Sequence, residues 1–184
     1  ELYGGELELR KYIPLSSPAL GTFFSTRRLS LVGNYTYSES EIKVRPGDTT
    51  ISFTSQPNEI DASLVFDTTR KLRLTGQSKH LLNVQVSLED TEKLSQQSIL
   101  LSYASKRATN RGPNLTPDFI ERPGLQLDIV VRQGFSLAGT NIEVKAEGRN
   151  LFGTNYREIQ TLNDSQLIIN RLRACGDGEA MTVE

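Results

Sequence analysis

Apolar and polar residues alternate along six segments of this chain. These segments are residues 3–10, 28–38, 81–89, 98–104, 125–132 and 142–149. Successive side chains of a β-strand point to opposite faces of the sheet, so a period of two predicts strands with one apolar and one polar face. No segment keeps apolar residues at the i, i+3, i+4, i+7 spacing of a helix over three turns. The pattern therefore predicts an all-β chain of antiparallel strands.

The predicted strands are long and their polar faces carry many charges. The second segment extends from Arg28 to about Val44, whereas strands in globular proteins most often have ~5–6 residues. Strands that cross a membrane need ~9–11 residues. In outer-membrane barrels the apolar positions face lipid and the polar positions face a wet lumen. A soluble β-sandwich also has a wet face, so any single strand leaves both architectures open.

The connections between the predicted strands differ in length. Residues 45–78 and 106–121 form long connections, whereas residues 90–95 and 134–139 form short ones. Outer-membrane barrels have short periplasmic turns and longer extracellular loops, which gives this alternation. The connection over residues 14–27 is longer than a usual periplasmic turn. Both long connections contain Pro and Gly next to polar residues, and we expect them to be surface loops.

Composition excludes several classes of site. Lys and Arg total 21 and Asp and Glu total 22, for a net charge of -1, so the chain lacks the basic surplus of a nucleic-acid module. One Cys and one His exclude a disulfide framework within the chain, a Cys-rich zinc site and a site with several His ligands. The chain contains no GxGxxG, GxxxxGK[ST], HExxH or GxSxG motif. We therefore expect a protein that is not an enzyme and that has no cofactor, no metal and no nucleic-acid partner.

The charged side chains on the polar strand faces are candidates for the wall of a lumen. They are Glu6, Glu8, Arg10, Glu143, Lys145, Glu147 and Arg149. A carboxylate pair such as Glu143 and Glu147 also fits a glycosidase, but the neighbouring cations favour a charge-balanced wall.

The second long connection is basic and forms a candidate binding loop. Its cations are Lys106, Arg107, Arg111 and Arg122. They suit an anionic ligand, and solvated loop charges are the alternative interpretation. His80 is expected to be a strand-end residue, and Cys175 lacks the acid–base partner that a nucleophile needs.

Four stretches combine strand and loop patterns in a fixed order. They are residues 31–41, 74–84, 110–124 and 144–156. The last contains Asn150-Leu151-Phe152 and, after three further residues, Tyr156. In this order the stretches resemble the C-terminal part of the β-barrel of TonB-dependent outer-membrane receptors, in which an N-L-[FLT]-x-x-x-Y signature marks the penultimate strand. The resemblance covers roughly residues 1–162.

The resemblance implies an incomplete up-and-down transmembrane β-barrel segment over residues 1–172, followed by an irregular tail over residues 173–184. Barrels of this family have ~22 strands, and the pattern predicts about six, with a seventh starting near residues 156–160. Residues 167–169 are not expected to supply the closing strand. We therefore expect the chain to be a fragment.

The resemblance also implies a function. Such receptors lie in the cell outer membrane, contact its lipid, and import scarce or bulky ligands such as siderophores, cobalamin or glycans. Energy reaches them from TonB through a plug domain, which this sequence does not contain. The sequence does not identify the ligand. The alternative is a soluble β-sandwich module that binds carbohydrate or protein.

Overall fold

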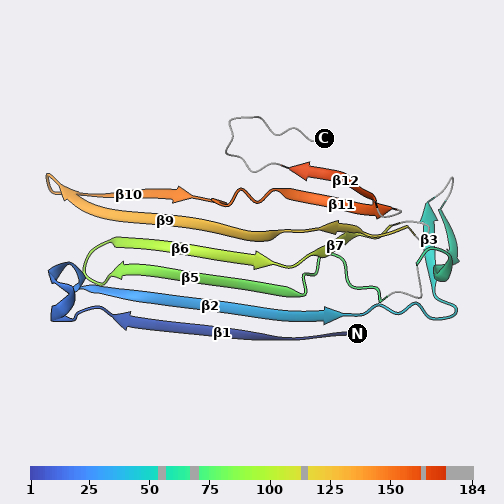
Figure 1. Cartoon of the computed structure of the whole chain (residues 1–184), viewed down its shortest axis with the longest axis horizontal. Coiled ribbons are helices and arrows are strands. Elements are labelled where there is room, and N and C mark those ends of the chain that lie inside the picture. Colours follow the sequence, from blue (N-terminus) through green and yellow to red (C-terminus); the bar gives the residue numbers. More distant parts are fainter. Residues whose placement is uncertain (54–56, 67–70, 113–115, 163–164, 173–184) are drawn as a thin grey trace.

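The structure is a computed structural model that describes residues 1–53, 57–66, 71–112, 116–162 and 165–172. The predicted tail, residues 173–184, lies outside the described residues. The largest element is a six-stranded antiparallel sheet (Figure 1). Its strands, in spatial order, are β1 (Leu2–Pro14), β2 (Arg27–Ser40), β5 (His80–Asp90), β6 (Ser95–Ala104), β9 (Gly124–Leu137) and β10 (Thr140–Gly148). The prediction of an all-β, antiparallel, up-and-down fold is confirmed.

The connections at the two ends of this sheet differ as the sequence predicted. At one end β1 and β2 are joined by a segment with two short 3₁₀ helices, η1 (Pro18–Leu20) and η2 (Thr22–Phe24). At that end residues 91–94 join β5 to β6, and residues 138–139 join β9 to β10. The long connections all lie at the opposite end, on the right of Figure 1.

The β9–β10 connection is a two-residue hairpin turn. Ala138 and Gly139 have φ angles of 50° and 82°. Positive φ at both central positions matches a type I′ turn, whose twist fits that of antiparallel strands. Glycine adopts this conformation freely, whereas alanine is strained in it because of its Cβ atom.

We expect Ala138→Asn to stabilise the fold by about 0.5–1 kcal/mol, because asparagine tolerates the left-handed conformation better than alanine. Gly139→Ala is the matched control, since open space surrounds that position and only the backbone penalty acts. Chemical unfolding followed by far-ultraviolet circular dichroism measures both. Equal stability of the two variants would contradict the turn assignment.

A second sheet continues three strands of the first sheet. It lies beyond the strand ends that carry the long connections. Its order is β12 (Ser165–Leu172), β11 (Tyr156–Leu162), β8 (Phe119–Glu121) and β7 (Arg107–Asn110). Ala104 pairs with Gly124 in the first sheet, and Arg107 pairs with Glu121 in the second. The pairing register of these two pairs is the same in the two sheets. The strand β7 is therefore a continuation of β6, and β8 leads into β9.

The strand predicted to start near residues 156–160 is present as β11, which begins at Tyr156 and pairs with β8. The next strand of the meander is β12, which pairs with β11 along its length. The pattern missed β12 because residues 167–169 form a short apolar run without clear alternation.

The connection over residues 45–78 is more ordered than the expected surface loop. It contains a hairpin of β3 (Thr49–Phe53) and β4 (Pro57–Asp61), followed by a 3₁₀ helix, η3 (Ala62–Leu64). Ile42 and Leu72 form an isolated β-bridge, and the Gly76 N–H donates to the Ala108 carbonyl at 2.7 Å. Backbone hydrogen bonds thus tie residues 72–79 to the segment after β2 and to β7.

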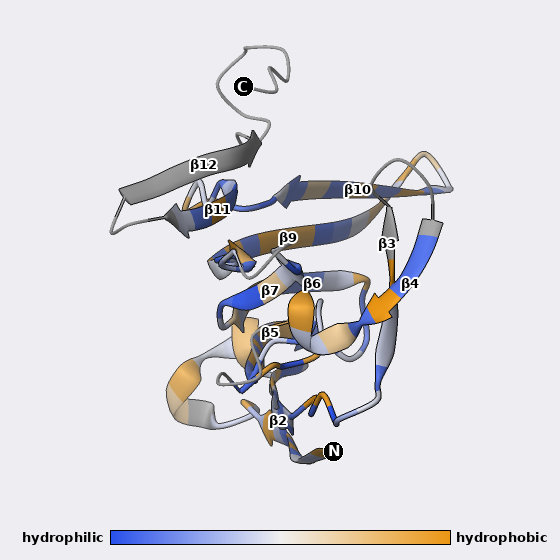
Figure 2. Cartoon of the chain, turned by 90° about the vertical axis from the view of Figure 1, so that its right-hand side faces the viewer, coloured by the Kyte–Doolittle hydropathy of each residue, from blue (hydrophilic) through white to orange (hydrophobic). Residues whose placement is uncertain are grey.

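The register gives the six-stranded sheet one polar and one apolar face. Residues directly opposite each other on paired strands share a face. One row runs through Tyr12, Ser30, Ser87, Ser98, Val130 and Glu147, and the adjacent row on the other face runs through Lys11, Leu31, Val86, Ile99, Ile129 and Gly148. The alternation is visible along β9 and β10 in Figure 2.

The apolar face is continuous across the strands, as the alternation predicted. Its residues, called the apolar belt below, include Leu29, Leu31, Tyr35, Tyr37, Leu82, Val84, Val86, Leu88, Ile99, Leu101, Tyr103, Leu125, Leu127, Ile129, Val131 and Val144. Many belt side chains are exposed, for example Ile99 at 49% and Val144 at 51%.

Apolar burial is scarce in this fold. Among the residues that the structure describes, the buried apolar ones are Ala62, Leu72 and Ile159, whereas Ser30, Ser87 and Ser98 are buried on the polar face. The chain exposes 13036 Å² of surface, against about 8,900 Å² for a compact monomer of its mass. On the central strands small polar side chains are thus covered, whereas many side chains of the apolar belt are open.

Candidate functional site: a basic recess at the loop end of the sheet

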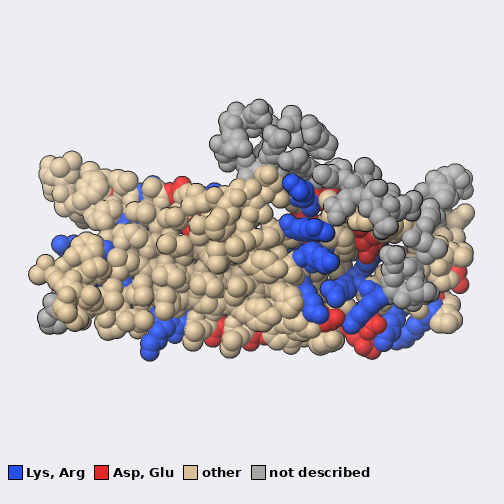
Figure 3. All heavy atoms as spheres, in the orientation of Figure 1, with Lys and Arg blue, Asp and Glu red and all other residues tan. Residues whose placement is uncertain are grey.

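A recess of about 270 Å³ lies where the two long connections meet. Its lining comprises Lys71, Arg73, Gln77, Lys106, Arg107, Ala108, Arg111, Asp118, Ile120, Arg122, Ile159 and Thr161. Six of these side chains are cations and one is a carboxylate. In Figure 3 lysines and arginines gather in a band across the molecule toward its loop end. We call this cavity the basic recess.

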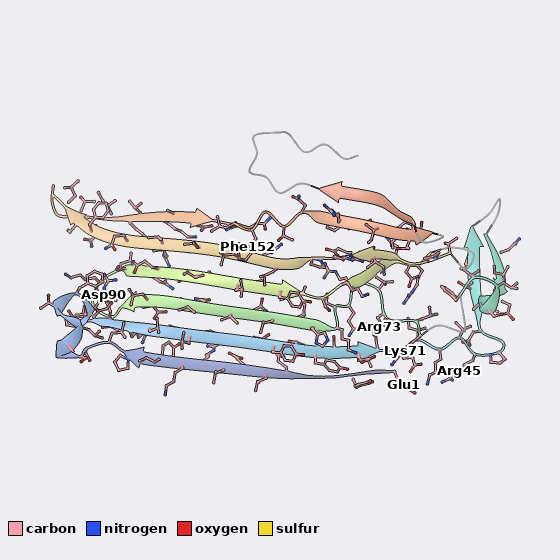
Figure 4. All side chains as sticks on the ribbon, in the orientation of Figure 1. Glu1, Arg45, Lys71, Arg73, Asp90 and Phe152 are labelled. Carbon is pink, nitrogen blue, oxygen red and sulfur yellow. The ribbon has the colours of Figure 1, made fainter. Side chains whose placement is uncertain are left out.

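All four predicted loop cations, Lys106, Arg107, Arg111 and Arg122, line this one cavity. The fold therefore brings these four side chains together, and ligand binding by them stays a prediction. Sequence reasoning missed Lys71 and Arg73, which lie together beyond the ends of β2 and β5 in Figure 4. The sequence contained one signal for them, because the two cations flank Leu72 in an alternating pattern, and Leu72 is buried.

Two of the arginines are held by carboxylates from β8 and its preceding loop. Arg107 Nε donates to Glu121 Oε2 at 2.7 Å, and Arg111 forms an ion pair with Asp118. The Gly112 N–H also donates to Asp118. Within the described part of the chain, neither Lys106 nor Arg122 is ion-paired with a carboxylate. The recess therefore keeps an excess of positive charge.

A single buried carboxylate orients the cations from the other connection. Glu39 accepts hydrogen bonds from Lys79 Nζ at 2.8 Å and from Lys71 Nζ at 3.1 Å, and Arg73 Nη2 lies 3.8 Å away. The hydrogen bond to Glu39 raises the pKa of both lysines above their ordinary value. Lys71 and Lys79 therefore stay cationic throughout the neutral and moderately alkaline range.

Apolar side chains from three strands also line the basic recess. Ala108, Ile120 and Ile159 form one row across β7, β8 and β11. Ala108 follows Ala104 and Ile120 precedes Gly124 by four residues each, in the same register. This row therefore continues the face of Ser98 and Ser87, whereas Arg107 and Glu121 lie on the face of the apolar belt.

The predicted lumen-wall residues share that polar face. Glu6, Glu8 and Arg10 pair with Thr36, Asn34 and Val32 of β2, and Glu143, Lys145 and Glu147 pair with Gly134, Arg132 and Val130 of β9. Arg149 follows β10 and donates to Glu147 at 2.7 Å. That they face a lumen stays a prediction.

Three of the predicted lumen-wall carboxylates are paired with cations. Arg10 lies 2.6 Å from Glu8, and Arg132 lies 2.7 Å from Glu143. Glu147 is paired with both Lys145 and Arg149.

His80 is the first residue of β5, as expected for a strand-end histidine. Its Nδ1 shares a hydrogen bond of 2.8 Å with the Tyr35 hydroxyl, and its ring stacks on Tyr35. Cys175 lies outside the described residues.

Within the described ranges, no cluster of three or more His, Cys, Asp or Glu side chains could hold a metal ion. No helix in those ranges is long and apolar enough to cross a membrane. Comparison with protein-family models, curated proteins and solved structures finds no match to this chain.

Proposed function

We propose that this chain is part of a TonB-dependent receptor of the bacterial outer membrane, which imports a scarce or bulky ligand. The observation that carries the proposal is the polarity of the sheet. Its apolar side chains lie open, whereas small polar side chains are buried on the other face. Membrane barrels have this arrangement because lipid covers the outer face and water fills the lumen.

The height of the apolar belt supports the proposal. On β2 the belt runs from Leu29 to Tyr37, which spans ~27 Å at ~3.4 Å per residue. With strands tilted by ~40°, the belt is ~21 Å high, close to the ~25 Å apolar band of outer-membrane barrels. Charged side chains bound it on the same face of β2, with Arg27 beside Asp90 at one end and Glu39 at the other.

The two faces then have distinct roles. The polar face forms the inner wall against which a plug domain packs, and TonB acts through that plug. The basic recess lies beyond the belt at the end with the long connections, which is the extracellular end in this family of barrels. Its cations Lys106, Arg107, Arg111 and Arg122 contribute to capture of an anionic ligand, and no bond of the ligand is broken.

A soluble β-sandwich would need a second sheet over the apolar belt. The described residues supply no such layer, because the second sheet prolongs the first. The membrane assignment accounts for the open belt without a further layer.

Size-exclusion chromatography of the full chain, expressed alone, tests the proposal. In plain buffer we expect aggregation, because the belt is a large exposed apolar surface and β1 is an open edge strand. A neutral maltoside detergent is expected to restore a single narrow peak. A sharp monomer peak in plain buffer, with cooperative unfolding, would contradict the membrane assignment.

A further inference from the structure

A second cavity adjoins the basic recess. It has a volume of about 410 Å³ and is lined mainly by apolar side chains from the first long connection. The apolar lining residues are Ile42, Val44, Ala62, Phe66, Leu72 and Leu74. We call it the apolar pocket. Arg111 lines both cavities, so its guanidinium stands at their junction.

Arg111 has an unused hydrogen-bond donor at that junction. Its Nη1 donates to Asp118. Its Nη2 is buried and has no hydrogen-bond partner among the described residues. A buried donor left unsatisfied costs free energy, and such exceptions call for a specific explanation. An acceptor group of a bound molecule would satisfy Nη2, once the side chains that cover this atom move aside, and would keep the pair with Asp118.

We propose that the two cavities together bind an amphipathic anion, a small molecule with a carboxylate, phosphate or sulfate head and an apolar body. The head lies in the basic recess, where it accepts from Arg111 and is attracted by Lys106 and Arg122. The apolar body lies in the apolar pocket. The inference rests on the proposed function, in that it names the class of ligand captured at the same site.

Both parts of the ligand are required by the shape and charge of the site. A simple inorganic anion would fill the basic recess and leave water in the apolar pocket. Its binding would gain no free energy from the burial of apolar surface. A neutral apolar molecule would leave the Arg111 donor unsatisfied and the cations without a counter-charge. An amphipathic anion satisfies both cavities at once.

Equilibrium dialysis of the full chain in a neutral maltoside detergent tests the proposal, with 2-naphthoate as the probe. Partition of the probe into detergent alone is subtracted as a blank. Two partial probes accompany it: sulfate supplies only the anionic head, and 2-naphthylmethanol supplies only the apolar body. We expect each partial probe to bind at least about tenfold more weakly than 2-naphthoate, which corresponds to ~1.4 kcal/mol.

Two variants separate the two cavities. The double variant Lys106→Gln with Arg122→Gln removes cations that hold no ion pair among the described residues, and we expect about tenfold weaker binding of 2-naphthoate. Phe66→Ala should weaken 2-naphthoate and leave sulfate unchanged. Arg149→Gln removes a cation paired with Glu147 on the sheet, outside the recess lining, and serves as the control with unchanged binding.

Three results would overturn the proposal: equal binding of sulfate and 2-naphthoate, equal binding of the naphthyl alcohol, or unchanged binding in the double variant with intact circular dichroism. Dialysis reports ligand binding, whereas the plain-buffer chromatography reports the membrane assignment. If the chain is soluble without detergent and binds 2-naphthoate, the membrane assignment has failed. If the chain depends on detergent and does not bind 2-naphthoate, the ligand proposal has failed.

Discussion

Replacing Ile99 by arginine is expected to destabilise the chain in lipid by about 2–4 kcal/mol, the cost of an arginine on the lipid face near the midplane of a membrane barrel. Ile99 lies in the middle of the apolar belt on β6, between Val86 and Ile129 of the neighbouring strands. Its side chain is 49% exposed. If water covered the belt, an arginine at this exposed position would cost little stability. The size of the destabilisation therefore depends on whether lipid or water covers the belt.

Ser102→Arg is the matched control for Ile99→Arg. Ser102 lies three residues further along β6 and faces the polar side between Asn83 and Gln126. We expect little change there, since water reaches that face. Urea unfolding in phosphatidylcholine vesicles, followed by circular dichroism, compares the two variants. If Ile99→Arg unfolds like the unmodified chain and also dissolves without detergent, the belt faces water and the receptor proposal fails.

Alternation alone predicted most of the large sheet. In β5 and β9 most side chains change face in step with their polarity, with Leu81 and Val130 as the apolar exceptions on the polar face, so the sequence defines both the strand and its register. The short strands β7 and β8 were not predicted, whereas β11 begins where the seventh strand was expected. Residues 110–124 contain Gly112, Pro117 and Pro123, and such residues normally indicate loops. Gly112 and Pro117 lie between β7 and β8, and Pro123 lies between β8 and β9, so these short strands stand between residues that indicate loops.

The basic recess could be predicted only in part. Its four cations between residues 106 and 122 lie close in the sequence, so a local surplus of charge identified them. Lys71 and Arg73 come from a connection more than 30 residues earlier, and their position depends on the Gly76–Ala108 hydrogen bond and the Ile42–Leu72 bridge. Such long-range contacts leave no periodic signal in one sequence.

The Asn-Leu-Phe signature has a structural explanation in the turn between β10 and β11. Asn150 has a φ angle of 50°, a conformation that asparagine tolerates better than most residues. Its Nδ2 donates to the Thr154 carbonyl at 2.9 Å, and the Thr154 N–H donates to its Oδ1 at 3.0 Å. The Asn150 N–H donates to Asp128 of β9 at 2.7 Å. Phe152, beside this segment in Figure 4, is 55% exposed.

Replacing Asn150 by alanine is expected to destabilise the chain by about 2–5 kcal/mol. The loss combines two hydrogen bonds, each worth about 0.5–1.5 kcal/mol, with the strain of alanine in the left-handed region, about 1–2 kcal/mol. Asn150→Gly separates the two contributions, because glycine removes the hydrogen bonds and carries little strain. We therefore expect Asn150→Gly to lie between the unmodified chain and Asn150→Ala in urea unfolding. If Asn150→Gly were as stable as the unmodified chain, the side-chain hydrogen bonds to Thr154 would contribute nothing to stability. Backbone conformation alone would then explain the asparagine of the signature.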